Sequence, residues 1–160
     1  MQPKIIHDGF EWIPLHEIHG MPPRKPDFRT PLLRIVRQSI PEEGSELLLV
    51  NGSGAPIQSI TVFKVGSFTA DGNVIVLEND TGFAYIDVPH GSAVKIDQFD
   101  DYYDLDYIIG FRIEVESEKL GRLLVNCFGN KGGMRDHVLL WDTWEAGRGI
   151  GISKLDESDE

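Results

Sequence analysis

Tyr107-Ile108-Ile109-Gly110-Phe111-Arg112-Ile113-Glu114-Val115-Glu116 is the stretch with the clearest periodicity in the chain. Alternate residues within it are apolar, and charged residues fill most of the positions between them. Successive side chains of a β-strand point to opposite faces of the sheet, so the alternation predicts a strand with one buried and one solvated face. We expect the core to take Ile109, Phe111, Ile113 and Val115, and the surface to take Arg112, Glu114 and Glu116.

Short apolar or β-branched runs separated by turn residues surround this stretch. Asn51-Gly52-Ser53-Gly54 and Lys119-Leu120-Gly121 are two of the turn signals. Further strands are expected at residues 46–50, 57–65, 74–77, 83–88, 93–96, 123–128, 138–141 and 150–153. Short strands with a turn every 8–12 residues are typical of antiparallel sandwiches and barrels. The sequence therefore predicts a mostly β protein, an antiparallel β-sandwich of about eight to nine short strands with at most one short helix.

The one helix expected lies between Thr30 and Pro41. Thr30 is a suitable N-cap, Pro31 suits the first helical position, and Pro41 would end the helix. Four apolar residues fall on one face at helical spacing, namely Leu32, Leu33, Val36 and Ile40. The β-branched residues of the same stretch leave a short strand as the alternative.

The N-terminal part differs in composition from the rest. Six of the nine prolines lie in residues 1–31. Proline at this density disfavours regular helices and ladders, yet large apolar residues such as Phe10 and Trp12 are frequent there. We expect residues 1–29 to form a proline-rich arm packed on the domain, residues 30–155 to form the sandwich, and residues 156–160 to form an acidic tail.

The chain is strongly acidic. Its 160 residues include 15 Lys or Arg and 26 Asp or Glu, which gives a net charge of −11. Nonspecific binding to nucleic acid or to an anionic membrane needs cationic surface, so both are disfavoured. An acidic balance fits a basic protein partner, or serves solubility alone. No apolar stretch is long enough to span a membrane and no secretory leader is evident, so a cytoplasmic location is expected.

No motif for catalysis, cofactor or metal stands out. His16-Glu17-Ile18-His19 has its histidines three apart, whereas the zinc-helix motif requires four. The glycine-rich residues 129–133 and 147–151 lack the remainder of a phosphate-binding motif and are expected in turns. Cys127, the single cysteine, lies in an apolar run and is expected to be a small buried hydrophobe. The sequence thus predicts a protein that is not an enzyme, with no metal and no cofactor.

One segment combines acidic and aromatic residues. Between residues 97 and 107 there are five aspartates, three of the four tyrosines, and no Lys or Arg. Aspartate is unfavourable in strands, so a loop is expected over 97–106. The candidate partner-binding residues are Asp97, Asp100, Asp101, Tyr102, Tyr103, Asp104, Asp106 and Tyr107.

Three interpretations of this segment stay open. The aspartates can cap turns while the aromatic rings enter the core. Alternatively, tyrosines surrounded by aspartates suit a contact with a basic protein, because tyrosine is enriched at interface hot spots and the charges steer encounter. Clustered aspartates also offer oxygen ligands for calcium, although the helix-loop-helix calcium pattern is not met.

The function expected from these features is a non-catalytic acidic binding protein that engages a basic protein partner. Its most concrete form is an immunity protein or antitoxin that neutralises a toxic enzyme by covering its active site. The alternative is a β-sandwich module that binds carbohydrate or membrane, with or without calcium. In that alternative, exposed Trp141 and Trp144 form the platform, although the alternation after Val138 favours Trp141 in the core.

Overall fold

The computed structural model describes residues 4–7, 9–13, 28–42, 44–70, 73–79, 83–99, 108–128 and 136–155. All regular structure in this part of the chain is β-strand. The strands are β1 (Ile5–Ile6), β2 (Pro31–Ile40), β3 (Gly44–Asn51), β4 (Ile57–Ala70), β5 (Asn73–Asn79), β6 (Ala84–Val88), β7 (Ala93–Phe99), β8 (Ile108–Ser117), β9 (Gly121–Phe128), β10 (His137–Trp141) and β11 (Gly151–Lys154). Among the described residues there is no helix long and apolar enough to cross a membrane.

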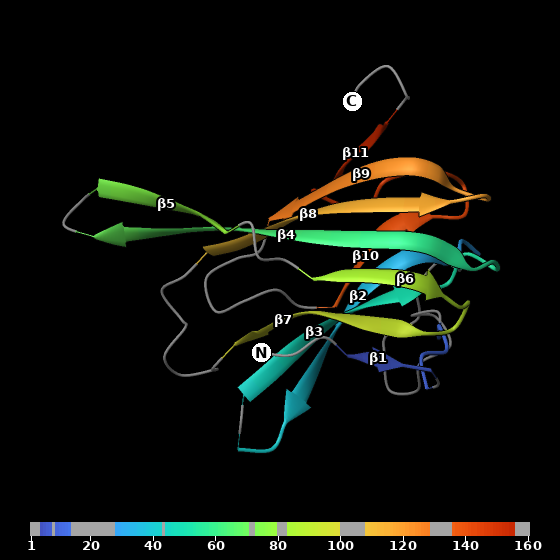
Figure 1. The fold of residues 1–160 in the computed structure, drawn as a ribbon, viewed down its shortest axis with the longest axis horizontal. Helices are drawn as coiled ribbons and strands as arrows, with labels where there is room; N and C mark the ends of the chain where they lie inside the picture. The colour runs from blue at the N-terminus through green and yellow to red at the C-terminus, as the bar shows by residue number, and fades with distance from the viewer. Residues whose placement is uncertain are drawn as a thin grey trace.

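Two antiparallel sheets make up the fold (Figure 1). Sheet A is five-stranded with the order β1-β7-β3-β2-β10. Sheet B is six-stranded with the order β11-β9-β8-β4-β5, and β6 pairs with β4 beside β5. The mostly β antiparallel sandwich predicted from the sequence is confirmed.

The core lies between the sheets and draws apolar residues from both. Its main cluster takes, among others, Leu33, Ile35 and Leu49 from sheet A and Ile60, Ile113 and Val125 from sheet B. The alternation in β8 has the predicted register: Phe111, Ile113 and Val115 are buried, whereas Arg112 and Glu116 are exposed. Glu114 is half-buried, and the side chain of Ile109 lies outside the described residues.

The helix expected at Thr30–Ile40 is wrong, because residues 31–40 form strand β2. This strand pairs with β3 over eight residues, from Leu33 opposite Asn51 to Ile40 opposite Gly44. Leu33 and Ile35 face the core, an alternation that period two explains and a helix does not. Pairing along both edges of β2 outweighs a favourable cap, so the strand alternative that the β-branched residues suggested is the one that forms.

β4 is longer than the sequence indicated. Its expected last residue was Val65, but the strand continues through Gly66 to Ala70. The extension is held by backbone pairing with β5, from Lys64 opposite Asn79 to Ala70 opposite Asn73. Glycine has no side chain to pack, but it supplies the same backbone donor and acceptor to the ladder, so it does not end the strand.

The described part of the N-terminal arm lies against sheet A. β1 pairs with β7, placing Ile6 opposite Ala93. Ile6 and Phe10 pack on a second, smaller apolar cluster formed by Leu48, Val50 and Ala93. Residues 14–27 and the tail at 156–160 lie outside the described residues, so the division into arm, sandwich and tail stays a prediction.

Truncation of one side chain on each face of β8 tests which face of this strand is in the core. Phe111→Ala should lower the free energy of unfolding by about 3–5 kcal/mol, because a side chain only 2% exposed is lost and a cavity remains. Glu116→Ala, on the exposed face of the same strand, should change it by less than about 0.5 kcal/mol. Urea unfolding followed by circular dichroism measures both, and equal losses would show that the two faces of β8 are not distinguished.

Candidate functional site

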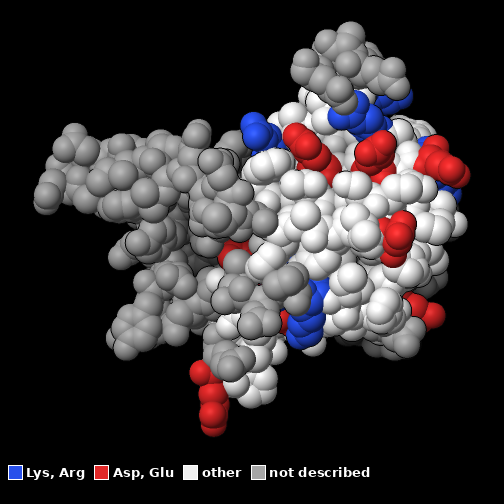
Figure 2. Space-filling model, in the orientation of Figure 1, with Lys and Arg blue, Asp and Glu red and all other residues white. Residues whose placement is uncertain are grey.

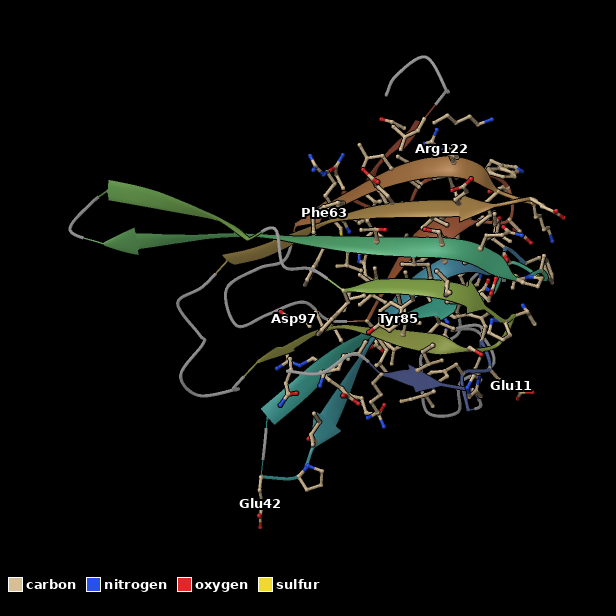
Figure 3. All side chains as sticks on the ribbon, viewed as in Figure 1. Glu11, Glu42, Phe63, Tyr85, Asp97 and Arg122 are labelled. Atoms are coloured by element: carbon tan, nitrogen blue, oxygen red, sulfur yellow. The ribbon has the colours of Figure 1, made fainter. Side chains whose placement is uncertain are left out.

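Strand β7 extends into the acidic segment, which was expected to be a loop from residue 97 onward. Asp97 belongs to β7, where it lies opposite Leu47 of the core and is fully buried (Figure 3). The expectation of a loop over 97–106 is therefore wrong for residues 97–99, and Asp97 is not an exposed contact residue. Its backbone continues the ladder with β3, and pairing to an adjacent strand outweighs the low strand propensity of aspartate. The other candidates, Asp100, Asp101, Tyr102, Tyr103, Asp104, Asp106 and Tyr107, lie outside the described residues.

The two strands that flank residues 100–107 fix where this segment attaches. Phe99, the last residue of β7, pairs with Ser45 in sheet A. Ile108, the first residue of β8, pairs with Ser67 in sheet B. Residues 100–107 therefore connect the two sheets. Figure 1 shows the end of β7 and the start of β8 at the same end of the molecule, the end from which β4 and β5 project.

A network of charged and polar groups lies next to this end. Glu46, on β3, is 2% exposed and accepts a hydrogen bond from Nζ of Lys4 at 2.9 Å. Its second oxygen lies 3.6 Å from Nζ of Lys95, which is itself 6% exposed and donates to Gln98 Oε1 at 2.5 Å. The arm thus contributes one of the two cations that neutralise a buried carboxylate.

Tyr85 joins the two sheets at the same edge. It belongs to β6 of sheet B, and its hydroxyl donates to the backbone oxygen of Lys95 in sheet A at 2.5 Å (Figure 3). The same hydroxyl accepts from the backbone nitrogen of Lys4 at 3.2 Å. Burial raises the pKa of Tyr85 above its usual value. Together with the Glu46 network, this contact ties the arm, β6 and β7 together, which is a structural role.

Cys127 is the structural residue that the sequence predicted. It is fully buried in the main core cluster, and its Sγ lies 3.7 Å from the backbone oxygen of Phe111. Burial raises its pKa to about 12, so the nucleophilic thiolate is scarce at neutral pH. Within the described ranges no group of three or more His, Cys, Asp or Glu is placed to hold a metal ion. His16 and His19 lie outside them.

The glycines of residues 147–151 serve the backbone. A Cβ on Gly147 would lie 1.6 Å from the backbone oxygen of Val138, so no larger residue fits at this approach. Gly149 has a φ of +75°, which favours glycine. The predicted turn is confirmed at residues 148–149, whereas Gly147 serves a close backbone approach and Gly151 begins strand β11. Residues 129–133 lie outside the described residues.

A groove beside the arm was not foreseen. Its volume is about 990 Å³, and it lies between residues 9–13 and the sheet, with Arg34 in its wall. Arg34 donates to the backbone oxygen of Phe10 at 2.8 Å, and burial lowers its pKa. Sequence reasoning missed the groove because segments far apart in the chain line it: residues 7 and 9–13, residues 30, 31 and 34, residues 50–52, and residues 90–91.

The histidines of this groove do not form a catalytic arrangement. His7 Nδ1 lies 3.2 Å from the hydroxyl of Ser92, and His90 Nδ1 accepts from the backbone nitrogen of Gly54 at 2.9 Å. Each ring is held to a different loop, and no activated nucleophile with its base and an orienting third group is assembled among the described residues. Among the described residues that line it, the groove offers a half-buried cation, Arg34.

The two tryptophans of the alternative function do not form a shared platform. Trp141 is half-buried, with the guanidinium of Arg29 4.2 Å from its ring centroid and the ring of Trp12 edge-on at 5.8 Å. The prediction that Trp141 lies in the core is therefore only partly confirmed. Trp144 is 51% exposed, with Nζ of Lys154 5.7 Å from its ring centroid. Since Arg29 covers a face of Trp141, Trp144 is the more open of these two tryptophans.

The outer face of sheet B carries mixed charge. Figure 2 shows acidic and basic side chains interspersed on the visible face rather than gathered by sign. On β8, Arg112, Glu114 and Glu116 share this face, and Glu116 lies opposite Arg122 of β9. This face therefore does not provide a concentrated acidic surface.

Comparisons of the chain with protein-family models, with curated proteins and with solved structures found no match.

The Glu46 network makes a prediction about stability. Glu46→Ala should lower the free energy of unfolding by about 3–5 kcal/mol, because Lys95 stays buried and loses its carboxylate. Lys4→Ala should cost less than about 1 kcal/mol, because the Lys4 side chain is 47% exposed and Lys95 still neutralises Glu46. Thermal and urea unfolding compare the two variants, and a smaller loss for Glu46→Ala would refute the buried pair.

Proposed function

We propose that this chain is a non-catalytic binding protein that engages a basic protein partner through residues 100–107. The observation that carries the proposal is an acidic, tyrosine-rich connection between the two sheets, attached at Phe99 and Ile108. Loops at the ends of a sandwich, held by a rigid frame, are a common place for binding residues. Asp97 has no part in the contact, because it is buried in β7.

The composition of residues 100–107 supports a partner that carries positive charge. The segment holds four aspartates and three tyrosines without any Lys or Arg. Aspartates at this density repel one another, and burial without a cation is costly, so they favour water or a cationic partner. Exposure to water suits the aspartates but not the tyrosines, because burial of their rings is favourable. A basic partner satisfies both groups at once.

The mixed charge on the outer face of sheet B makes that face a weaker candidate for docking a basic partner than residues 100–107. The net charge of −11 attracts basic proteins at long range, but specific docking requires a local surface. Because Arg112 and Arg122 lie among the acidic residues of sheet B, that face offers less attraction than a segment with aspartates alone.

The most concrete form of the proposal is an immunity protein or antitoxin. Such a protein needs no chemistry of its own, and the one thiol here is buried with a raised pKa. A toxic nuclease is the natural target, because its substrate groove is basic and an acidic aromatic surface competes there with nucleic acid. The proposal places the chain in the cytoplasm, where such a nuclease meets its substrate.

The alternative, a module for carbohydrate or membrane, has less support. A sugar platform needs open aromatic faces, and Arg29 covers a face of Trp141. Trp144 is exposed, and a glycan screen with the Trp144→Ala variant as control tests whether it binds sugar.

Charge reversal in the acidic segment tests the proposal. In the triple variant Asp100→Lys, Asp101→Lys and Asp104→Lys, association with the partner should slow and its salt dependence should weaken. The matched control reverses Glu116, Glu118 and Asp142, which are exposed acids on the described surface. This control changes the net charge equally and should keep more of the association rate.

The measurement starts from the products of neighbouring genes. Each is expressed alone to find one that stops growth, and then together with the wild-type chain or a triple variant. We expect rescue by the wild-type chain and by the control, and loss of rescue by the Asp100, Asp101 and Asp104 variant. If that variant folds and protects fully at low expression, residues 100–107 are structural. If no basic toxic product is found, the immunity form of the proposal fails.

A further inference from the structure

Among the described strands, β5 lies at an edge of sheet B, and Glu78 is its one charged residue. All seven of its residues pair with β4, and the register has no shift. Among the described strands β5 pairs with β4 alone. Its sequence, Asn73-Val74-Ile75-Val76-Leu77-Glu78-Asn79, contains neither lysine nor proline. Edge strands are ordinarily blunted by such residues or by bulges, and a regular apolar edge without them readily accepts another strand.

The part of β4 and β5 farthest from the core is a ribbon of two strands. Pairing between β4 and β8 ends where Ser67 meets Ile108. Beyond that point Phe68, Thr69 and Ala70 pair only with β5 in the part of the chain that the structure describes. Figure 1 shows this ribbon projecting from the remainder of the molecule. A two-stranded ribbon is marginally stable in water, whereas three or more strands give a stable sheet.

The sequence of β5 is suited to pairing with itself. In an antiparallel pair of two identical strands centred on Val76, Asn73 lies opposite Asn79 and Ile75 lies opposite Leu77. Val76 lies opposite Val76 of the second copy. Polar ends meet polar ends and apolar centres meet apolar centres, which is the arrangement that stabilises cross-strand neighbours. The one mixed pair joins Val74 and Glu78.

We propose that β5 docks against β5 of a second copy of this chain, in antiparallel register about Val76. The two ribbons then form one four-stranded sheet with the order β4-β5-β5-β4. The near-palindromic pattern of β5 selects a second copy over an unrelated strand. The association is independent of the basic partner proposed above, because it needs this chain alone.

Electrostatics oppose this association and make it dependent on salt. Each copy carries a net charge of −11, so two copies repel at low ionic strength. Salt screens the repulsion, whereas backbone hydrogen bonds and apolar contacts persist. Sedimentation velocity should therefore show a larger dimer fraction in about 0.5 M than in about 0.05 M sodium chloride.

A cysteine at the centre of the register gives the sharpest test. In the proposed dimer two Val76 positions face each other with Cα atoms about 4.5–5.5 Å apart, within reach of a disulfide. Two Val74 positions are about 13 Å apart, since each is paired with Glu78 four residues away. Val76→Cys should therefore form a covalent dimer under mild oxidation, and the matched variant Val74→Cys should form none above the wild-type level. Cys127 does not interfere, because it is buried with a raised pKa.

Circular dichroism first establishes that both variants keep the fold, and non-reducing gel electrophoresis then measures the covalent dimer. A covalent dimer from Val76→Cys alone supports the register. Equal cross-linking by the two variants, or none by either, overturns it. In the same way, a wild-type chain that stays monomeric at both salt concentrations overturns the proposal.

Discussion

β4 is the strand on which the arrangement of sheet B depends. It pairs with β8 along one side over nine residues, from Ser59 opposite Glu116 to Ser67 opposite Ile108. On its other side it pairs first with β6 and then with β5. Because a strand has only two edges, β6 and β5 share one edge in succession. The first half of β4 therefore belongs to the sandwich, where Ile57, Ile60 and Val62 are buried, and its last residues, 68–70, form the ribbon with β5.

The two sheets are joined at one edge by polar contacts rather than by apolar packing alone. Tyr85 reaches from β6 to the backbone of β7, and Glu46 draws Lys4 of the arm and Lys95 of β7 together. A buried ion pair adds little net stability over an apolar replacement, because both charges lose their hydration. Its effect here is on position: it fixes the arm against sheet A, next to the end at which β7 leads toward residues 100–107.

The sequence predicted elements whose signal is local. The alternation of β8 places Phe111, Ile113 and Val115 in the core because period two has no helical equivalent over that length. The same logic failed at β2, where Leu32, Leu33 and Val36 satisfy helical spacing as well, and pairing with β3 and β10 decided the outcome. It failed again at Asp97, since the preference of aspartate for loops is weaker than a ladder that continues past it. The groove at Arg34 and the contact of Trp12 with Trp141 join segments distant in the chain, and no local pattern indicates them.

The central claim is that most of β4 is stabilised within the chain, whereas its last residues, 68–70, and strand β5 depend on a second copy. Amide hydrogen exchange of the protein alone at low and high concentration tests this claim directly. Residues 57–63 should be protected equally at both concentrations, because β6 and β8 cover them within one chain. Residues 68–70 and 73–79 should exchange fast when dilute and slow when concentrated. Equal protection of the two regions, independent of concentration, would contradict the account.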